Sequence, residues 1–174
     1  MNLVNKLACF SHSKTYWLIY IYGALVLLSA ALFFQYVLDN PPCVLCIQVR
    51  MLIALFVIVC LLALFSLNNK FLNSAAQLAV ILIAGALVER SYQLLGTERG
   101  FLFGDCGFDV GLPSWFALDE WLPWLFRVET SCGYTPEILF GITMAESLMA
   151  LSVLLLIASF CVFLLSFVRV KDYA

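Results

Sequence analysis

The sequence has very little charge. Only 11% of its 174 residues are charged, 64% are hydrophobic, and the mean hydropathy is +1.04. Soluble domains carry roughly 25% charged residues, so this composition excludes an ordinary soluble domain and indicates an integral membrane protein. The net charge of −2 gives no reason to expect nucleic acid as a partner, because nucleic-acid-binding domains are strongly basic.

Histidine and glycine-rich motifs are scarce as well. The only histidine, His12, is isolated in a polar tail and indicates no site. No nucleotide-binding glycine motif is present, so a soluble nucleotide carrier is not expected. Cysteine, in contrast, is abundant. The chain has seven cysteines, so at least one thiol stays free if all the others pair within the chain.

Four apolar stretches are long enough to cross a bilayer, which requires about 20 helical residues. Because backbone groups in hydrocarbon must hydrogen-bond internally, each stretch is expected to be a helix. We therefore predict an all-α membrane protein with a single domain over 1–174, a four-transmembrane-helix bundle with a long outer loop. The spans are expected over about 16–38, 44–67, 75–92 and 142–168, and the outer loops over about 39–43 and 93–141.

Positively charged residues predict the orientation of the bundle. They lie before the first span, between the second and third, and after the fourth, at Lys6, Lys14, Lys70, Arg169 and Lys171. These three segments share one face, which the positive-inside rule makes cytoplasmic. Both termini are therefore expected in the cytoplasm.

The cysteines divide according to this orientation. Disulfides persist in oxidising compartments, so the cysteines on the outer face are the candidates for redox chemistry. On the predicted topology these are Cys43, Cys46, Cys106 and Cys132. Cys9 falls on the inner side, and we expect Cys60 and Cys161, which lie within spans, to act as small apolar fillers or incidental thiols.

The long outer loop contains a segment rich in tryptophan and phenylalanine, over 113–126. Such a segment is typical of a short helix that lies in the plane of the lipid headgroups. It either anchors the bundle as an aromatic belt or places the loop cysteines close to the membrane surface, and the two roles are compatible.

Cys43 and Cys46 form a CxxC motif at the expected start of the second span. Pro41-Pro42 blocks a helix immediately before Cys43, so the helix should begin at the motif and place both sulfurs on one face. The partial positive charge of a helix N-terminus favours the nucleophilic thiolate. Arg50 lies one turn deeper on the same face and would add to this effect. Alternatively, Arg50 is an interfacial residue whose side chain extends to the headgroups.

Cys106 and Cys132 form a second, widely separated pair. The spacing allows either a structural disulfide that constrains the loop or a redox-active pair that meets Cys43 and Cys46. A zinc site formed by all four cysteines is a third interpretation. It is disfavoured because structural Cys₄ sites usually consist of two close pairs.

Two stretches together resemble a known family. The run Pro42-Cys-Val-Leu-Cys-Ile-Gln-Val-Arg50 and the run Leu112-Pro-Ser-Trp-Phe-Ala-Leu-Asp-Glu-Trp-Leu-Pro123 are similar to signatures of the DsbB family of bacterial inner-membrane proteins. The resemblance also covers the four-span plan and the separation of the loop cysteines. It implies an oxidoreductase that reoxidises a periplasmic oxidant of the DsbA type and passes electrons to a membrane quinone, either ubiquinone or menaquinone.

The resemblance also implies roles for individual residues. The partner would attack Cys106, Cys132 would then engage Cys43, and Cys46 would be left as the thiolate that faces the quinone. Arg50 would support that thiolate and bind a quinone oxygen. Arg90 and Gln93 resemble a family segment near the quinone pocket, and no metal is implied.

Two alternatives to this function stand beside it. One is a quinone reductase similar to the vitamin K epoxide reductase group, in which electrons flow the other way. The other is a non-catalytic membrane protein that is held by structural disulfides or binds a metal.

Overall fold

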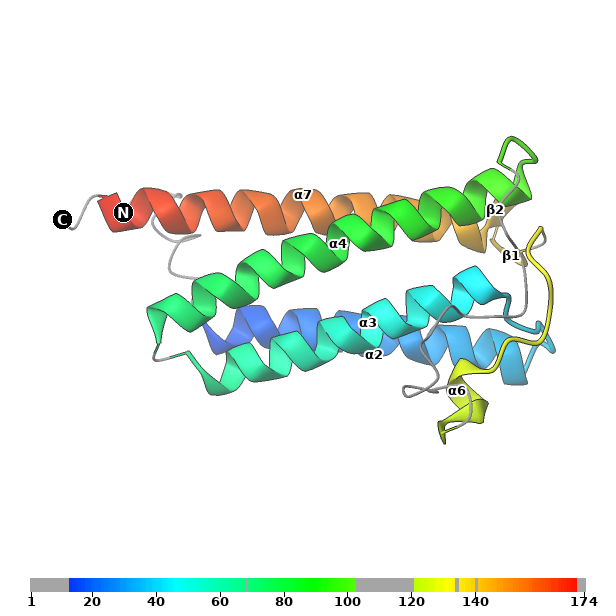
Figure 1. The fold of residues 1–174 in the computed structure, drawn as a ribbon, viewed down its shortest axis with the longest axis horizontal. Coiled ribbons are helices and arrows are strands. Elements are labelled where there is room, and N and C mark those ends of the chain that lie inside the picture. The colour runs from blue at the N-terminus through cyan, green and yellow to red at the C-terminus, as the bar shows by residue number, and fades with distance from the viewer. Residues whose placement is uncertain (1–12, 68, 103–120, 134, 140, 172–174) are drawn as a thin grey trace.

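The computed structural model describes residues 13–67, 69–102, 121–133, 135–139 and 141–171. Four long helices lie side by side along the long axis of the molecule (Figure 1), each long and apolar enough to cross a membrane. The predicted all-α membrane fold is thereby confirmed. The helices are α2 (Lys14–Tyr36), α3 (Val44–Phe65), α4 (Lys70–Glu98) and α7 (Met144–Lys171).

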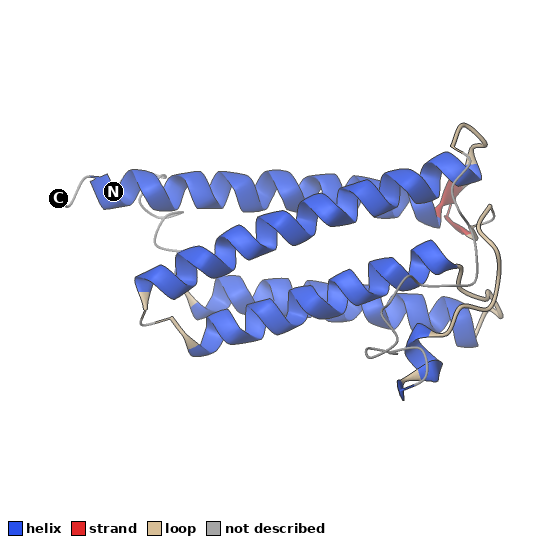
Figure 2. Cartoon of the chain, viewed as in Figure 1, coloured by secondary structure: helices blue, strands red, loops and turns tan. Residues whose placement is uncertain are grey.

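The remaining elements are small and lie at one end of the bundle (Figure 2). They are the short helix α6 (Pro123–Phe126) and an antiparallel pair of strands, β1 (Glu137–Leu139) and β2 (Ile142–Thr143). Gly141 joins the strands with a φ of 78°, a conformation that glycine adopts without steric cost. The strands were not predicted, because strands of three and two residues are too short to show an alternating pattern of apolar and polar residues.

Helix α4 is longer than the predicted span at both ends. It runs from Lys70 to Glu98, whereas the apolar pattern indicated about 75–92. Beyond the apolar part, polar side chains continue the helix, and the Thr97 hydroxyl donates to the Gln93 carbonyl at 3.0 Å. Hydropathy reports where the lipid-compatible part ends, while the hydrogen-bonded helix continues into the polar region.

The predicted interfacial helix is described only in its last part. The structure describes residues 121–126 of this segment, where α6 forms a single turn, and the rest of the segment lies outside the described residues. Pro123 occupies the first turn of α6, where its missing N–H leaves no bond unmade. Trp121 and Trp124 are exposed, as expected for side chains at a membrane surface.

The interior of the bundle contains a few polar side chains that hydrogen-bond to one another. Trp17 and Asn73 are fully buried, and the Trp17 indole N–H donates to the Asn73 side-chain oxygen at 3.2 Å. The outer surface is apolar instead, with large side chains such as Leu82 and Leu154 more than 60% exposed. This distribution suits a lipid environment, where the exterior needs no polar cover.

The two ends of the bundle differ in what they contain. The start of α2, the end of α3, the start of α4 and the end of α7 lie at one end of the bundle (Figure 1). The turn between α2 and α3, helix α6 and the β1–β2 pair lie at the other end. The CxxC motif also lies at this second end, which is therefore the candidate location of the redox site.

Candidate functional site

The turn between α2 and α3 positions the CxxC motif. Asp39 has a φ of 49°, which reverses the chain after α2, and the Asn40 N–H donates to the Phe34 carbonyl at 3.1 Å. Two prolines then extend the backbone up to Cys43, which is the N-cap of α3. The predicted helix start at the motif is confirmed.

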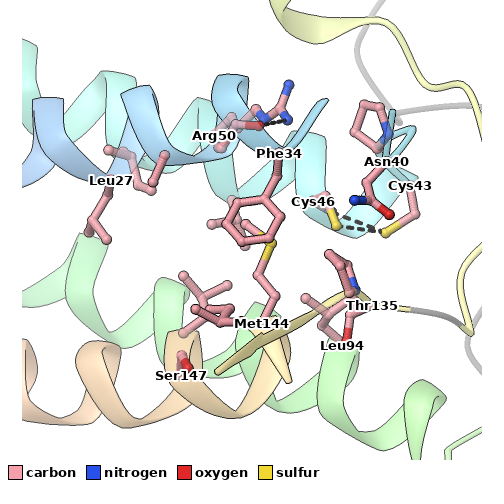
Figure 3. Close-up of a pocket in the computed structure, with 18 of the residues that line it drawn as sticks. Leu27, Phe34, Asn40, Cys43, Cys46, Arg50, Leu94, Thr135, Met144 and Ser147 are labelled. Carbon is pink, nitrogen blue, oxygen red and sulfur yellow. Dashed lines mark hydrogen bonds between the residues drawn. The ribbon is translucent and has the colours of Figure 1, made fainter. Parts of the chain in front are cut away.

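Cys43 and Cys46 lie in contact at the start of α3. Their sulfur atoms are 2.9 Å apart, and the Cys46 N–H donates to the Cys43 sulfur at 3.4 Å (Figure 3). Cys43 is 1% exposed, whereas Cys46 is partly exposed. A disulfide has an S–S length of about 2.05 Å, so these thiols need only a small shift to form one.

The two thiols are electrostatically unequal. Hydrogen bonding to Cys46 and burial raise the pKa of the Cys43 thiol above its usual range, and a hydrogen bond with Cys132 opposes this rise. Cys43 therefore holds its proton. Cys46 lies inside the first turn of α3, where the N–H groups and the helix dipole favour negative charge.

The loop segment after α6 brings a third cysteine to the pair. The N–H groups of Glu129 and Thr130 both donate to the Pro42 carbonyl, at 3.0 and 3.4 Å, and Thr130 forms an isolated parallel bridge with Cys43. Two residues further on, Cys132 packs, like Cys46, against the buried cluster that contains Cys43. The structure thus brings three of the four predicted site cysteines together. Cys106 lies outside the described residues.

Arg50 is buried one turn below Cys46 and has three hydrogen-bond acceptors. One terminal nitrogen donates to the Gln35 side chain at 2.6 Å and to the Leu125 carbonyl at 3.2 Å, and the other donates to the Ala31 carbonyl at 3.1 Å. In Figure 3 its guanidinium is turned toward α2. Arg50 therefore ties α3 to both α2 and α6. The sequence reasoning missed Gln35, although a polar residue within an apolar span is itself a functional signal.

An apolar cavity lies beside Cys46. It encloses about 130 Å³, and its wall combines Cys43, Cys46 and Arg50 with side chains of α2, α4 and α7 (Figure 3). A second apolar cavity, of about 460 Å³, lies next to it along α2 and α7. The two cavities share four lining residues, Leu27, Ile53, Leu148 and Leu151.

Arg90 and Gln93 lie away from these cavities. The Arg90 guanidinium donates to the Gln93 side-chain oxygen at 3.0 Å, and the Gln93 amide donates to Glu89 at 3.3 Å. In this part of α4, Leu94 lines the cavity beside Cys46 instead. The assignment of Arg90 and Gln93 to a quinone site stays a prediction from resemblance.

Within the described part of the chain, no three histidine, cysteine, aspartate or glutamate side chains form a group that could hold a metal ion.

The chain is similar to known bacterial proteins over most of its length. A family model described as "Disulfide bond formation protein DsbB" matches residues 13–162. Disulfide bond formation protein B of Shewanella amazonensis is 32% identical over 155 residues, which cover 88% of this chain and 92% of that protein. Its namesake in Psychromonas ingrahamii is 34% identical over 132 residues, covering 73% and 69%. Disulfide bond formation protein B 2 of Pseudomonas aeruginosa is 27% identical over 147 residues, covering 83% and 87%.

The raised pKa of Cys43 predicts unequal thiol reactivity. In fully reduced protein at neutral pH, a small alkylating reagent should modify Cys46 faster than Cys43, because thiolates are the nucleophiles. The rate at Cys43 should keep rising with pH beyond about 8–9, the usual range of a thiol. Mass spectrometry of the labelled peptides across pH measures both rates. A Cys43 rate that levels off near pH 9 would contradict the assignment.

Proposed function

Because the chain belongs to the DsbB family of disulfide bond formation proteins and is a membrane-embedded protein-disulfide oxidoreductase, we propose that it is a quinone-dependent thiol oxidase. In this reaction the dithiol of a periplasmic DsbA-like protein becomes a disulfide, and a membrane quinone takes the two electrons and two protons. The family assignment decides against the non-catalytic alternative.

One juxtaposition carries this proposal. Cys46 lies in the wall of an apolar cavity between membrane-spanning helices, and Cys43 connects it to Cys132 on the polar loop. A thiol pair in this position has access to a lipid-soluble electron acceptor on one side and to protein thiols on the other. A pair that served only as a structural disulfide would not need the cavity.

The positions of the cysteines support a sequence of disulfide exchanges. The thiolate is the attacking species in such exchange, and each step forms one S–S bond and breaks another. Cys132 is packed against Cys43, so the step that joins the loop to the CxxC motif uses these two sulfurs. Cys46 then leaves as the thiolate, where the α3 N-terminus and the Arg50 charge stabilise it. By the family resemblance, Cys106 receives the thiolate of the partner.

The cavity beside Cys46 has the chemistry that a quinone requires. Its wall is mainly apolar, and the polar side chains of Asn40, Thr135 and Ser147 reach it at separate points. This combination of an apolar lining and a few polar groups is typical of small-molecule sites. A bound quinone supplies a two-electron oxidant there, while Cys46 and Arg50 supply the reacting sulfur and a fixed positive charge.

The direction of electron flow agrees with known potentials. Oxidants of the DsbA type have reduction potentials of about −120 mV, so they require an acceptor with a higher potential. The route from DsbA through DsbB to quinone is what keeps the bacterial periplasm oxidising. On this proposal the chain lies in the bacterial inner membrane, with the cysteine end toward the periplasm and both termini in the cytoplasm.

Serine substitutions test the relay. Cys43→Ser, Cys46→Ser, Cys106→Ser and Cys132→Ser should each abolish turnover, because each removes one sulfur from the path of the electrons. The measurement is the loss of quinone absorbance during anaerobic turnover with a reduced DsbA-like protein. Cys9→Ser, Cys60→Ser and Cys161→Ser are the matched controls and should stay active. Full activity in any of the first four variants would refute the relay.

Arg50→Ala should raise the quinone KM by about tenfold or more and change the partner KM much less. Losing a charged hydrogen-bond donor costs about 1.5–3 kcal/mol, and about 1.4 kcal/mol is a factor of ten. Steady-state kinetics with each substrate varied in turn separates the two constants. Arg127→Ala, at an exposed arginine of the same end, is the control. An unchanged quinone KM would remove Arg50 from the site.

The proposed orientation predicts which thiols a reagent can reach. In intact spheroplasts under reducing conditions, a membrane-impermeant maleimide should label Cys106 and Cys132 and should leave Cys9 unlabelled until the membrane is permeabilised. Single-cysteine variants resolved by gel shift provide the readout. The opposite pattern, with Cys9 reached from outside, would place the site in the cytoplasm and exclude the periplasmic partner.

A further inference from the structure

Thr135 lies in the wall between two cavities of different character. On one side is the apolar cavity beside Cys46, and on the other is a polar cavity of about 550 Å³ at the end of the bundle. Asn40, like Thr135, lines both, whereas Glu98, Glu137 and Thr143 line only the polar one. Glu137 is exposed, so the polar cavity is accessible to water.

Glu98 is the acidic residue directly bonded to this wall. It is the last residue of α4, and its Oε2 accepts a hydrogen bond from the Thr135 hydroxyl at 2.6 Å and another from the Thr143 hydroxyl at 3.2 Å. Thr135 is only 5% exposed. A carboxylate that water can reach is therefore connected, through one buried hydroxyl, to the cavity beside Cys46.

The proposed reduction of a quinone needs a proton at the cavity beside Cys46. Once the exchanges have released Cys43 from Cys132, the CxxC pair holds a Cys43 thiol and the Cys46 thiolate that the relay produces, so its oxidation to the disulfide releases two electrons and only one proton. A quinone that takes two electrons needs two protons to become a hydroquinone. The second proton must come from the aqueous side, and apolar side chains cannot carry it.

We propose that Glu98 and Thr135 relay this second proton from the polar cavity to the electron acceptor bound beside Cys46. This inference rests on the proposed quinone-dependent activity. Glu98 takes a proton from water and passes it to the Thr135 oxygen, while the Thr135 hydroxyl proton moves on to the reduced acceptor. Glu98 acts through Thr135, and its negative charge is restored once it has passed the proton on, so that it can take up the next one from water.

A purely structural role for Glu98 makes a different prediction. The hydrogen bonds of Glu98 to Thr135 and Thr143 also hold the end of α4 against the β1–β2 hairpin and the residues next to it, 135–139 and 141–143. Other hydrogen bonds hold this hairpin segment without Glu98. Glu146 accepts from the Thr143 N–H and pairs with Arg99, and the Met144 N–H donates to the Pro136 carbonyl at 3.0 Å. Variants of Glu98 should therefore keep the hairpin in place.

The test uses Glu98→Gln in the full-length protein. Glutamine keeps a side-chain oxygen that can accept both threonine bonds, but it cannot release and take up a proton. With a short-tailed ubiquinone, kcat should fall at least about tenfold, in the range of losses seen for positioned acids and bases. The quinone KM should stay unchanged. Thr135→Val should show the same loss, Thr135→Ser should restore the rate, and Glu137→Gln is the matched control.

Three further measurements distinguish a proton-relay role of Glu98 from a structural one. Quinone binding, followed by quenching of tryptophan fluorescence, and the thermal unfolding temperature should both match the wild type in Glu98→Gln. Oxidation of the reduced DsbA-like partner in a single turnover without quinone should also be unchanged, because it involves no acceptor protonation. A normal kcat in Glu98→Gln, or equal losses in both half-reactions, would overturn the relay. Failure of the wild type to reduce quinone would instead overturn the proposed function.

Discussion

The cysteine end of the molecule depends on the hydrogen bonds that the Pro42 carbonyl accepts. Pro41 and Pro42 have no N–H, so this stretch cannot join α3, and the Pro42 carbonyl points to the loop that follows α6. The backbone N–H groups of Glu129 and Thr130 donate to that carbonyl. This short pairing places Cys132 against the CxxC motif, although 86 positions separate Cys132 from Cys46 in the sequence. The prolines thus serve two purposes: they set the start of α3 and they expose an acceptor for the loop.

Arg50 shows how a buried charge can organise several elements at once. A charged group among membrane-spanning helices is costly in free energy unless its donors are satisfied. Here α2 supplies two acceptors, and the Leu125 carbonyl of α6 supplies a third. The same charge lies one turn from Cys46 and lines the apolar cavity. A single side chain therefore fixes the relative positions of α2, α3 and α6 and contributes to the field around the reacting sulfur. Removing the arginine would abolish both effects at once. Removing Gln35 would mainly weaken the link between α2 and α3.

The sequence predicted the parts of the structure that follow from local chemistry. Four long apolar runs require four helices, and consecutive prolines before Cys43 require a helix start there. The contacts that complete the site were not predictable, because they join residues distant in sequence. The Gln35–Arg50 bond, the docking of Glu129 on Pro42 and the bonds of Glu98 to two threonines all arise from packing. The end of α4 was also missed, since hydropathy marks the limit of the lipid and not the limit of the helix.

Cys43 has a further consequence for the energetics of the proposed redox pair. Its sulfur accepts the Cys46 N–H at the first turn of α3, and in the proposed reaction the same sulfur changes oxidation state. A thiol sulfur and a disulfide sulfur accept such a hydrogen bond with different strength. The stability of the first turn of α3 is therefore coupled to the reduction potential of the cysteine pair. For a two-electron couple, about 1.4 kcal/mol corresponds to about 30 mV. Capping residues contribute about 0.5–2 kcal/mol. The local stability of a single helical turn is thus large enough to adjust the driving force of the whole chain of exchanges by tens of millivolts.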